Sequence, residues 1–368
     1  METSLIASSP VLFRRSLGTI ASAAAIFVIA GCANSGTMTP ATRVLPGSSF
    51  RTEPASSSGY TFYTVDYPYE SPNRITGIAD NQEIVGVYGS GIGSGSQAYH
   101  SFTSQYNSSQ PYTQFQNDDY PNAPSTYMSS ITQLPHSGGV IQSGYVVDPD
   151  DLNGTWGVLD DKGLWTLIRR HRGEGKCHMM ELFGINESYF SVGFYWQDDG
   201  PPSGGCAKHT QYITEVRPGE GFHDFSQVVG KNPVAYGVNK SGWLVGSTDN
   251  SASAASQGWT KMVCKGCRKG TQVAYWNYNN NSNFSTQMLG VNNAGTVVGT
   301  YQDSSGNWHG LVATNLLSVS GQPGWQSIDE PNGNQTSTVI SGIDNNGDIC
   351  GWYTGTDGLT HGFVGLYQ

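Results

Sequence analysis

One pattern recurs along most of this chain and constrains its fold more than any other feature. Each copy has a Gly-Ile or Gly-Val pair, a short polar turn, and an apolar run with a glycine inside it. Clear copies begin at Gly77, Gly184, Gly237, Gly290 and Gly342. The last four are 53, 53 and 52 residues apart, and the 107 residues between the first two are about twice this period. A weaker copy lies midway, around Leu134, so the chain contains six repeats.

Each repeat is expected to form four short strands, because it is rich in β-branched and aromatic residues and broken by Asn-Gly, Thr-Gly and Asp-Gly turns. In the last repeat we expect strands at about 325–329, 338–343, 349–353 and 361–366. Glycine supplies 48 of 368 residues without a three-residue period, and Asp, Glu, Lys and Arg together supply 12%, which excludes coiled coils, helical bundles and collagen. A four-stranded sheet buries both faces only between neighbouring copies. The sequence therefore predicts an all-β fold, a six-bladed β-propeller over residues 60–368.

Other repeat architectures fit less well. The rungs of a parallel β-helix are much shorter than this repeat, and separate four-stranded modules would each lack a core. A strand at Phe62–Val65 is expected to complete the last blade and close the ring, because the sequence ends inside a predicted strand.

Short motifs within the repeats resemble a known family. Asp-Tyr-Pro occurs at Asp66–Pro68 and Asp119–Pro121, and His-Gly-Phe occurs at His361–Phe363. Together with the Gly-Ile-Asn type of turn, they resemble the HAF-type repeats of bacterial extracellular proteins. That family has no agreed activity, so the resemblance implies the fold and an extracytoplasmic location and no catalytic residues.

The first 59 residues are expected to stand apart from the propeller. Arg14 and Arg15 precede an apolar run at 17–30 that is too short to span a bilayer and suits a signal peptide, residues 1–31. The run ends Ile-Ala-Gly-Cys, which resembles a bacterial lipobox with Cys32 as the lipidated residue; an ordinary secretory signal is the alternative. Residues 32–59 then form a flexible Ser, Thr and Pro tether. We expect an exported protein that is anchored to a membrane of the bacterial cell envelope through lipidated Cys32.

Repeated polar residues are first interpreted as structural. His100, His309 and His361 occupy equivalent positions in three repeats, and we expect each imidazole to bond to the backbone of its own blade. The segment Asp344–Asp348 is interpreted as hairpin-turn chemistry, because its counterparts are ordinary Asn and Gly turns. A central metal held by the histidines and a calcium ion held by the aspartates are the alternatives, and no metal site is predicted.

Two segments break the repeat and carry a large share of the basic residues. They are 169–181 and 261–270, and we expect both to follow the last strand of a repeat and to emerge on one face. On a chain of net charge −10 they would form a basic patch for an anionic partner such as a lipid head group or an acidic glycan. Two solvated loops with no partner are the alternative. The predicted binding residues are Arg169, Arg170, Arg172, Lys176, Lys261, Lys265, Arg268 and Lys269.

The remaining cysteines suit an oxidising compartment. We expect disulfides between Cys177 and Cys206 and between Cys264 and Cys267, although three pairings of these four are formally open. A zinc site or a redox dithiol at the Cys-x-x-Cys sequence is the alternative. Cys350 replaces a valine of other repeats and is expected to be a buried thiol.

No nucleophile elbow, P-loop or dinucleotide-binding fingerprint is present in the sequence. We predict no catalytic residues and no cofactor, and we interpret the protein as a monomeric, non-catalytic envelope protein that binds an anionic glycan, an envelope component or a protein partner. A nucleic-acid ligand is not expected for an acidic, exported chain. The alternative is a carbohydrate-active hydrolase or lyase with carboxylates at the propeller mouth, for which the adjacent pairs Asp118–Asp119 and Asp198–Asp199 are candidates.

Overall fold

The computed structural model describes residues 59–68, 71–89, 99–109, 111–147, 154–168, 179–198, 209–217, 221–225, 231–249, 256–263, 273–317, 322–334 and 337–368. The predicted signal peptide, Cys32 and the predicted tether precede the described residues. Within the described part of the chain, no helix has the length and apolar character needed to cross a membrane.

The described strands form six antiparallel sheets of four strands, called blades 1 to 6. Blade 1 contains β2 (Asn73–Ile78), β3 (Glu83–Tyr88), β4 (His100–Gln105) and β5 (Phe115–Asn117). Blade 2 contains β6 (Thr126–Gln133), β7 (Val140–Val147), β8 (Thr155–Asp161) and β9 (Leu164–Ile168). Blade 3 contains β10 (Met180–Ile185), β11 (Ser191–Asp198), β12 (His209–Arg217) and β13 (Gly221–Phe225).

Blade 4 contains β14 (Lys231–Val238), β15 (Trp243–Asp249), β16 (Ser256–Met262) and β17 (Ala274–Trp276). A turn of 3₁₀ helix, η1 (Tyr278–Asn280), follows it. Blade 5 contains β18 (Ser285–Val291), β19 (Val297–Gln302), β20 (Trp308–Thr314) and β21 (Gly324–Ile328). Blade 6 contains β22 (Val339–Ile343), β23 (Ile349–Thr354), β24 (Thr360–Tyr367) and β1 (Tyr60–Val65).

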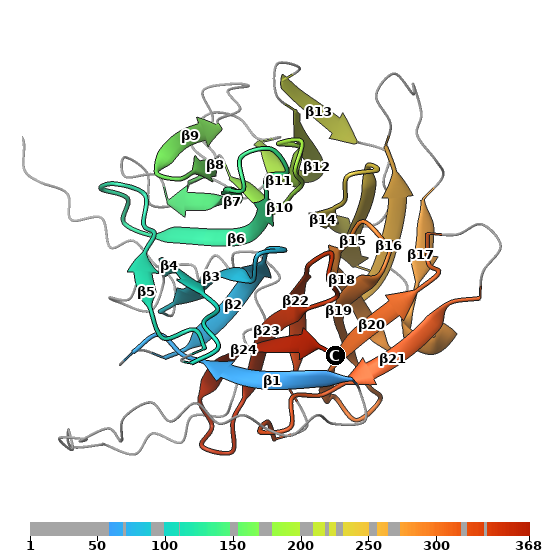
Figure 1. Ribbon diagram of the computed structural model, residues 1–368. Coiled ribbons are helices and arrows are strands. Elements are labelled where there is room, and N and C mark those ends of the chain that lie inside the picture. The colour runs from blue at the N-terminus through green and yellow to red at the C-terminus, as the bar shows by residue number, and fades with distance from the viewer. Residues whose placement is uncertain are drawn as a thin grey trace, which may run out of the picture. The chain divides into compact units, whose positions relative to one another are not determined.

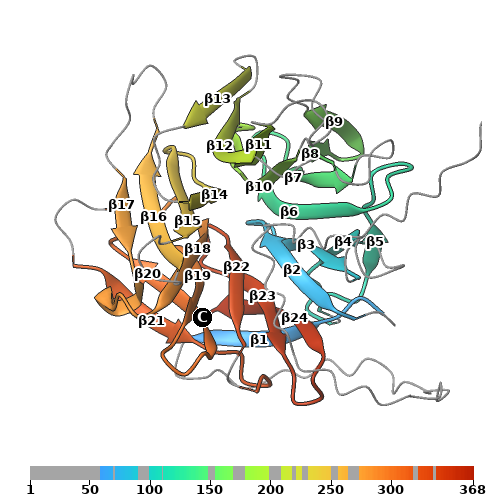
Figure 2. The same ribbon diagram turned by 180° about the vertical axis from the view of Figure 1, so that it is seen from behind.

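The six sheets stand in a ring, with the first strand of each blade at the centre and the fourth strand outermost (Figures 1 and 2). Apolar side chains fill the spaces between blades. Val85 of blade 1, for example, packs with Met128 and Val158 of blade 2, and all three are fully buried. The predicted six-bladed β-propeller is confirmed.

Repeats and blades are out of phase by one strand. Residues 324–328 form the outermost strand of blade 5, where Gly310 pairs with Ile328, and not a strand of the last blade as expected from the repeat. Blade 6 is instead completed by β1, which runs antiparallel to β24 from Tyr60 opposite Tyr367 to Val65 opposite Gly362. The predicted closure of the ring by an N-terminal strand is confirmed.

Glycines in the repeats permit two close approaches of backbone. On the second strand of blade 5, a Cβ on Gly299 would lie 1.9 Å from the carbonyl oxygen of Gln287, because the inner strand bulges beside it. On the inner strand of blade 3, a Cβ on Gly184 would lie 2.6 Å from the carbonyl oxygen of Tyr236 in blade 4. Real Cβ atoms do not come so close, so the first glycine lets a blade bulge and the second lets inner strands meet at the axis.

Candidate functional site

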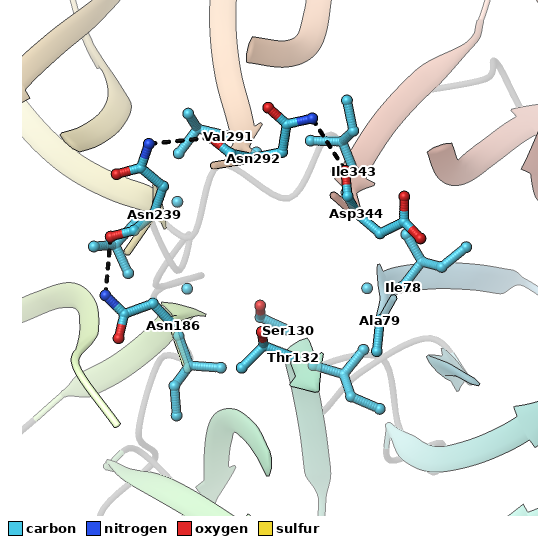
Figure 3. A pocket seen from close by; sticks show the side chains of 18 of the residues that line it. Ile78, Ala79, Ser130, Thr132, Asn186, Asn239, Val291, Asn292, Ile343 and Asp344 are labelled. Atoms are coloured by element: carbon cyan, nitrogen blue, oxygen red, sulfur yellow. Dashed lines mark hydrogen bonds between the residues drawn. The ribbon is translucent and has the colours of Figure 1, made fainter. Parts of the chain in front are cut away.

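A cavity of about 70 Å³ lies on the propeller axis between the six inner strands. Two layers of side chains bound it. The layer where the inner strands end, called the hairpin end, contains Ala79, Thr132, Asn186, Asn239, Asn292 and Asp344 (Figure 3). The layer further up the strands contains Thr76, Ser129, Phe183, Tyr236, Leu289 and Ser341.

Asparagine amides join neighbouring blades at the hairpin end. Asn186 Nδ2 donates to the carbonyl oxygen of Asn239 at 2.9 Å, Asn239 Nδ2 to that of Asn292 at 3.0 Å, and Asn292 Nδ2 to that of Asp344 at 3.1 Å (Figure 3). Each Oδ1 accepts a backbone N–H of its own hairpin, as Asn239 does from Trp243. Every amide is therefore used twice, once for its turn and once for the next blade.

Further polar contacts cover the hairpin end. From blade 6 to blade 1, Asn345 donates to the Asp80 carboxylate through its backbone N–H at 2.9 Å and its Nδ2 at 2.8 Å. Glu187 of blade 3 pairs with Lys240 of blade 4 and accepts a bond from Asn293 of blade 5. These groups satisfy one another, so the hairpin end is a structural clasp.

The turn at Asp344 forms part of the same clasp. Asp344 Oδ1 accepts the backbone N–H groups of Asn346 and Asp348 at 2.9 and 2.8 Å, which confirms the turn interpretation. Burial, with the neighbouring Asp348 charge, raises the pKa of Asp344 to about 7. Among the described residues, no three His, Cys, Asp or Glu side chains gather closely enough to hold a metal ion.

The six-fold symmetry breaks one layer further from the hairpin end. Each inner strand except that of blade 2, which has Ser130, contains a repeat glycine near the axis, called the axial glycine: Gly77, Gly184, Gly237, Gly290 and Gly342. Three residues before these positions, the side chains differ in charge and size from blade to blade. The six side chains are Arg74, Tyr127, Glu181, Val234, Gln287 and Val339. Glu181 lies on β10 two residues before the cavity-lining Phe183, next to a β-bulge between Leu182 and Gly184.

Glu181 is a buried acid with an unsatisfied oxygen. Its side chain is 2% exposed, and Oε2 has no hydrogen-bond partner in the described structure. Burial raises the pKa of Glu181 to about 8, so the carboxyl is mostly protonated at pH 7.

Arg74 is held between aromatic rings. Its guanidinium carbon lies 6.0 Å from the ring centre of Tyr99 and 5.9 Å from that of Trp352, at the cation–π range. Its Nη1 is buried without a hydrogen-bond partner among the described atoms. The two rings thus hold a cation with one unpaired buried nitrogen, Nη1.

Aromatic rings connect these two residues around the axis. Tyr99 meets Tyr127 edge-on at 5.1 Å, and Tyr127 stacks on Tyr145 at 5.0 Å. Phe183 lies 6.2 Å from Tyr145 and 5.2 Å from Tyr236. We call these five residues the axial aromatic cluster. The charges of Glu181 and Arg74 both act on the pKa values of Tyr127 and Tyr145, so the acid and the cation flank the same rings.

The three repeated histidines bind carboxylates and not the backbone, which corrects the expected partner. Nδ1 of His100 lies 2.8 Å from Asp119, that of His309 2.9 Å from Asp329, and that of His361 2.7 Å from Asp66. His100 and His309 also stack on a tyrosine of the second strand, and His361 lies tilted against Tyr353. In blade 4 the same place holds an amide pair, Gln257 Nε2 to Asn277 Oδ1 at 3.1 Å. The role is structural, since each pair fastens the third strand of a blade to its outermost strand.

The predicted basic patch lies mostly outside the described residues, including Arg169, Arg170, Arg172, Lys176, Lys265, Arg268 and Lys269. Lys261 is described: it is 8% exposed on β16, where burial lowers its pKa and the Glu215 charge raises it. One segment follows Ile168, at the end of a fourth strand, and the other follows Met262, at the end of a third. In antiparallel blades these ends are opposite, so the strand order does not support a shared face.

The other candidate residues fall into two groups. The first group lies outside the described residues and contains Cys177, Cys206, Cys264, Cys267 and Asp199. The side chain of Asp198 is likewise outside the described structure. Cys350 is a buried free thiol, as predicted, and burial raises its pKa to about 12. Asp119 is bound to His100, and burial raises the pKa of Asp118 to about 6.

Comparison with known proteins supplies similarity of fold and no family. No family model and no curated protein matches this chain, so the HAF-type resemblance stays a prediction. Among solved structures, 26 chains match. A mutant of the Aleuria aurantia lectin in complex with alpha-methyl-L-fucoside is 10% identical with a TM-score of 0.47, over 82% of this chain and 93% of that chain. TolB from Acinetobacter baumannii is 10% identical with a TM-score of 0.41, over 73% of this chain and 60% of that chain. These likenesses are too distant to assign a ligand.

Proposed function

We propose that this propeller is a carbohydrate-binding protein and that the axial aromatic cluster, with Arg74 and Glu181, receives the sugar. One observation carries the proposal. At the hairpin end the polar groups satisfy one another, whereas a cation and an acid near the axial aromatic cluster each have a hydrogen-bonding atom that is unpaired in the described structure. Buried polar groups are normally paired, so unpaired ones near a cluster whose Phe183 and Tyr236 line the cavity indicate a place for a ligand.

The residue types suit a sugar. A pyranose ring has apolar C–H faces, which pack on aromatic rings such as Phe183 and Tyr236, and hydroxyls that need hydrogen-bond partners. Arg74 donates several hydrogen bonds, and a protonated Glu181 both donates and accepts. An aromatic wall with a few placed polar groups is the general composition of small-ligand sites.

Binding is favoured over hydrolysis by the number of carboxyl groups. Glycoside hydrolysis usually uses two carboxyl groups on either side of the scissile bond. In the described part of this layer, Glu181 is the one carboxyl group. We therefore place binding ahead of a hydrolase or lyase. An exported position with Cys32 lipidated remains part of the proposal and depends on residues 1–32, outside the described structure.

The test is a binding screen of the purified full-length protein against neutral and acidic mono- and oligosaccharides, read by saturation-transfer NMR and calorimetry. Phe183→Ala is expected to weaken binding of any retained glycan about tenfold, because it removes a ring that lines the cavity. Trp165→Ala is the matched control, since Trp165 is a half-buried ring on the outermost strand β9. Absence of binding, or equal weakening by the two substitutions, would contradict the proposal.

A further inference from the structure

The charge of Arg74 is not balanced within the described structure. Among the inner-strand side chains that the structure describes, Arg74 is the one basic group. It forms no ion pair with a described carboxylate within 4.0 Å, and its Nη1 is buried without a hydrogen-bond partner. A guanidinium that is held between rings, with Nη1 unpaired and no described carboxylate within 4.0 Å, is suited to a planar anion such as a carboxylate.

Glu181 does not cancel this charge at neutral pH. It is 2% exposed with no cation beside it, and burial raises its pKa to about 8. At pH 7 the protonated carboxyl is a neutral hydrogen-bond donor, so the site carries one positive charge. The chain as a whole has a net charge of −10, which disfavours binding of acidic ligands at arbitrary places on its surface.

We infer that the ligand is an acidic sugar, with its carboxylate bound by Arg74, its ring against the axial aromatic cluster, and a hydroxyl near Glu181. This inference rests on the proposed function and narrows it to one class of carbohydrate. Tyr99 of blade 1 and Trp352 of blade 6 hold the guanidinium of Arg74. Glu181 of blade 3 lies close enough to Tyr145 of the axial aromatic cluster for its charge to act on that tyrosine. One carboxylate on a hexose satisfies Arg74 and leaves the hydroxyls for the other side of the site.

Two pairs of sugars that differ at carbon 6 alone provide the test. Galacturonic acid is compared with galactose, and glucuronic acid with glucose, by calorimetry on the full-length protein at pH 7. For at least one pair the acid is expected to bind about tenfold more tightly or better, because a charge-assisted hydrogen bond is stronger than one from a neutral group. This comparison needs no variant.

Variants then locate the preference. Arg74→Gln is expected to remove the difference between acid and neutral sugar, and Arg74→Lys to retain part of it. Lys240→Gln is the matched control, because Lys240 is a 61% exposed cation at the hairpin end, paired with Glu187. It is expected to leave the preference unchanged.

The outcomes separate the two proposals. Neutral sugars that bind as tightly as their acids would overturn the acidic-sugar inference and leave the carbohydrate-binding proposal standing. A preference for acids that survives Arg74→Gln in a folded variant would overturn the assignment to Arg74. No binding of any sugar, in the screen or in these pairs, would overturn both.

Discussion

The contact between His361 and Asp66 fastens the strand that closes the ring, and its loss should weaken that closure. His361 lies on β24 and Asp66 directly follows β1, so the two are neighbours in space and 295 residues apart in the chain. Nδ1 lies 2.7 Å from Asp66 Oδ2, and Nε2 lies 3.2 Å from both carboxylate oxygens of Asp357. The perturbation is His361→Gln, which keeps a polar side chain and removes the charge.

The magnitude follows from the pKa of His361. The two carboxylates raise it from 6.5 to about 9, the hydrogen bond to Asp66 being the largest cause. At about 1.4 kcal/mol per pH unit, the upper limit of the stabilisation is about 3 kcal/mol. Asp66 and Asp357 are 35% and 47% exposed, so solvent screening reduces the expected value to about 1–2 kcal/mol.

The pH dependence has a definite sign. Because the pKa of His361 is raised in the folded state, the protonated imidazole stabilises the folded protein fully at pH values below 6.5, its pKa in the unfolded chain. This stabilisation is lost as the pH rises through about 9. Urea unfolding at pH 6 and pH 10 measures it: His361→Gln should cost about 1–2 kcal/mol at pH 6 and clearly less at pH 10. Amide hydrogen exchange of β1 should be faster in the variant at pH 6.

The matched control is His309→Gln, which removes an equivalent imidazole from blade 5, where the outermost strand follows the third strand directly in the chain. This control should leave hydrogen exchange of β1 unchanged. An equal loss of stability at pH 6 and pH 10 in His361→Gln, or no loss at pH 6, would refute the reasoning.

Four other substitutions test the fold and the site. Gly299→Ala should lower the free energy of unfolding by about 3 kcal/mol or more, because its Cβ would lie 1.9 Å from a backbone oxygen. Gly358→Ala, at φ +79° in open space, should lower it by about 1 kcal/mol. Equal losses for the two variants in urea unfolding would count against this reasoning. Asn239→Asp keeps the oxygen that accepts from the turn and loses the N–H that donates to the next blade, so the free energy of unfolding should fall by about 1–3 kcal/mol. A variant as stable as the wild type would show that this amide bond between blades does not stabilise the ring. The raised pKa of Glu181 lowers the free energy of unfolding of the wild type as the pH rises from 4.5 to about 8, whereas Glu181→Gln has no group to titrate there. The free energy of unfolding of the variant relative to the wild type should therefore rise by about 1.4 kcal/mol per pH unit in that range. A difference that stays constant with pH would contradict this.

The repeat spacing was sufficient to predict the architecture. Copies at 52 to 53 residues specify the number of blades, because each copy must cover its neighbours' faces. Closure by β1 was predicted because the sequence ends inside a strand, and the structure shows that the last repeat supplies three strands to its own blade. The assignment of 325–329 to the last blade was wrong, because sequence similarity marks a repeat and not where hydrogen bonding divides one sheet from the next.

The histidine partners could have been found in part. His100 and Asp119 are 19 residues apart, and His309 and Asp329 are 20 apart, so two copies carry the same pairing within a repeat. Blade 4 carries an amide pair at the equivalent place, which is the same signal in another chemistry. The Asp66 contact spans 295 residues and becomes visible only after ring closure is assumed.

The candidate site was not predictable from single copies. Arg74 and Glu181 each look like an ordinary polar residue of one strand, and both act on the pKa values of Tyr127 and Tyr145 because the inner strands converge on the axis. Aligning the copies on the axial glycine would have marked the position, because its six residues differ in charge and size. The basic segments are recognisable in the sequence because their charged residues are neighbours along the chain. The candidate site is not, because the ring brings together residues that are one or more repeats apart.

Ring closure by β1 also sets the order in which the protein can assemble. Among the described strands, β1 is the first to be synthesised and its partner β24 is the last. The unfolded chain must therefore close a loop of about 300 residues before any part gains the full benefit of the ring, which favours slow and cooperative folding. Until then blade 6 exposes an unpaired edge. Open repeat arrays solve this problem with special capping repeats, whereas in this molecule the strand that precedes blade 1 in the sequence completes blade 6.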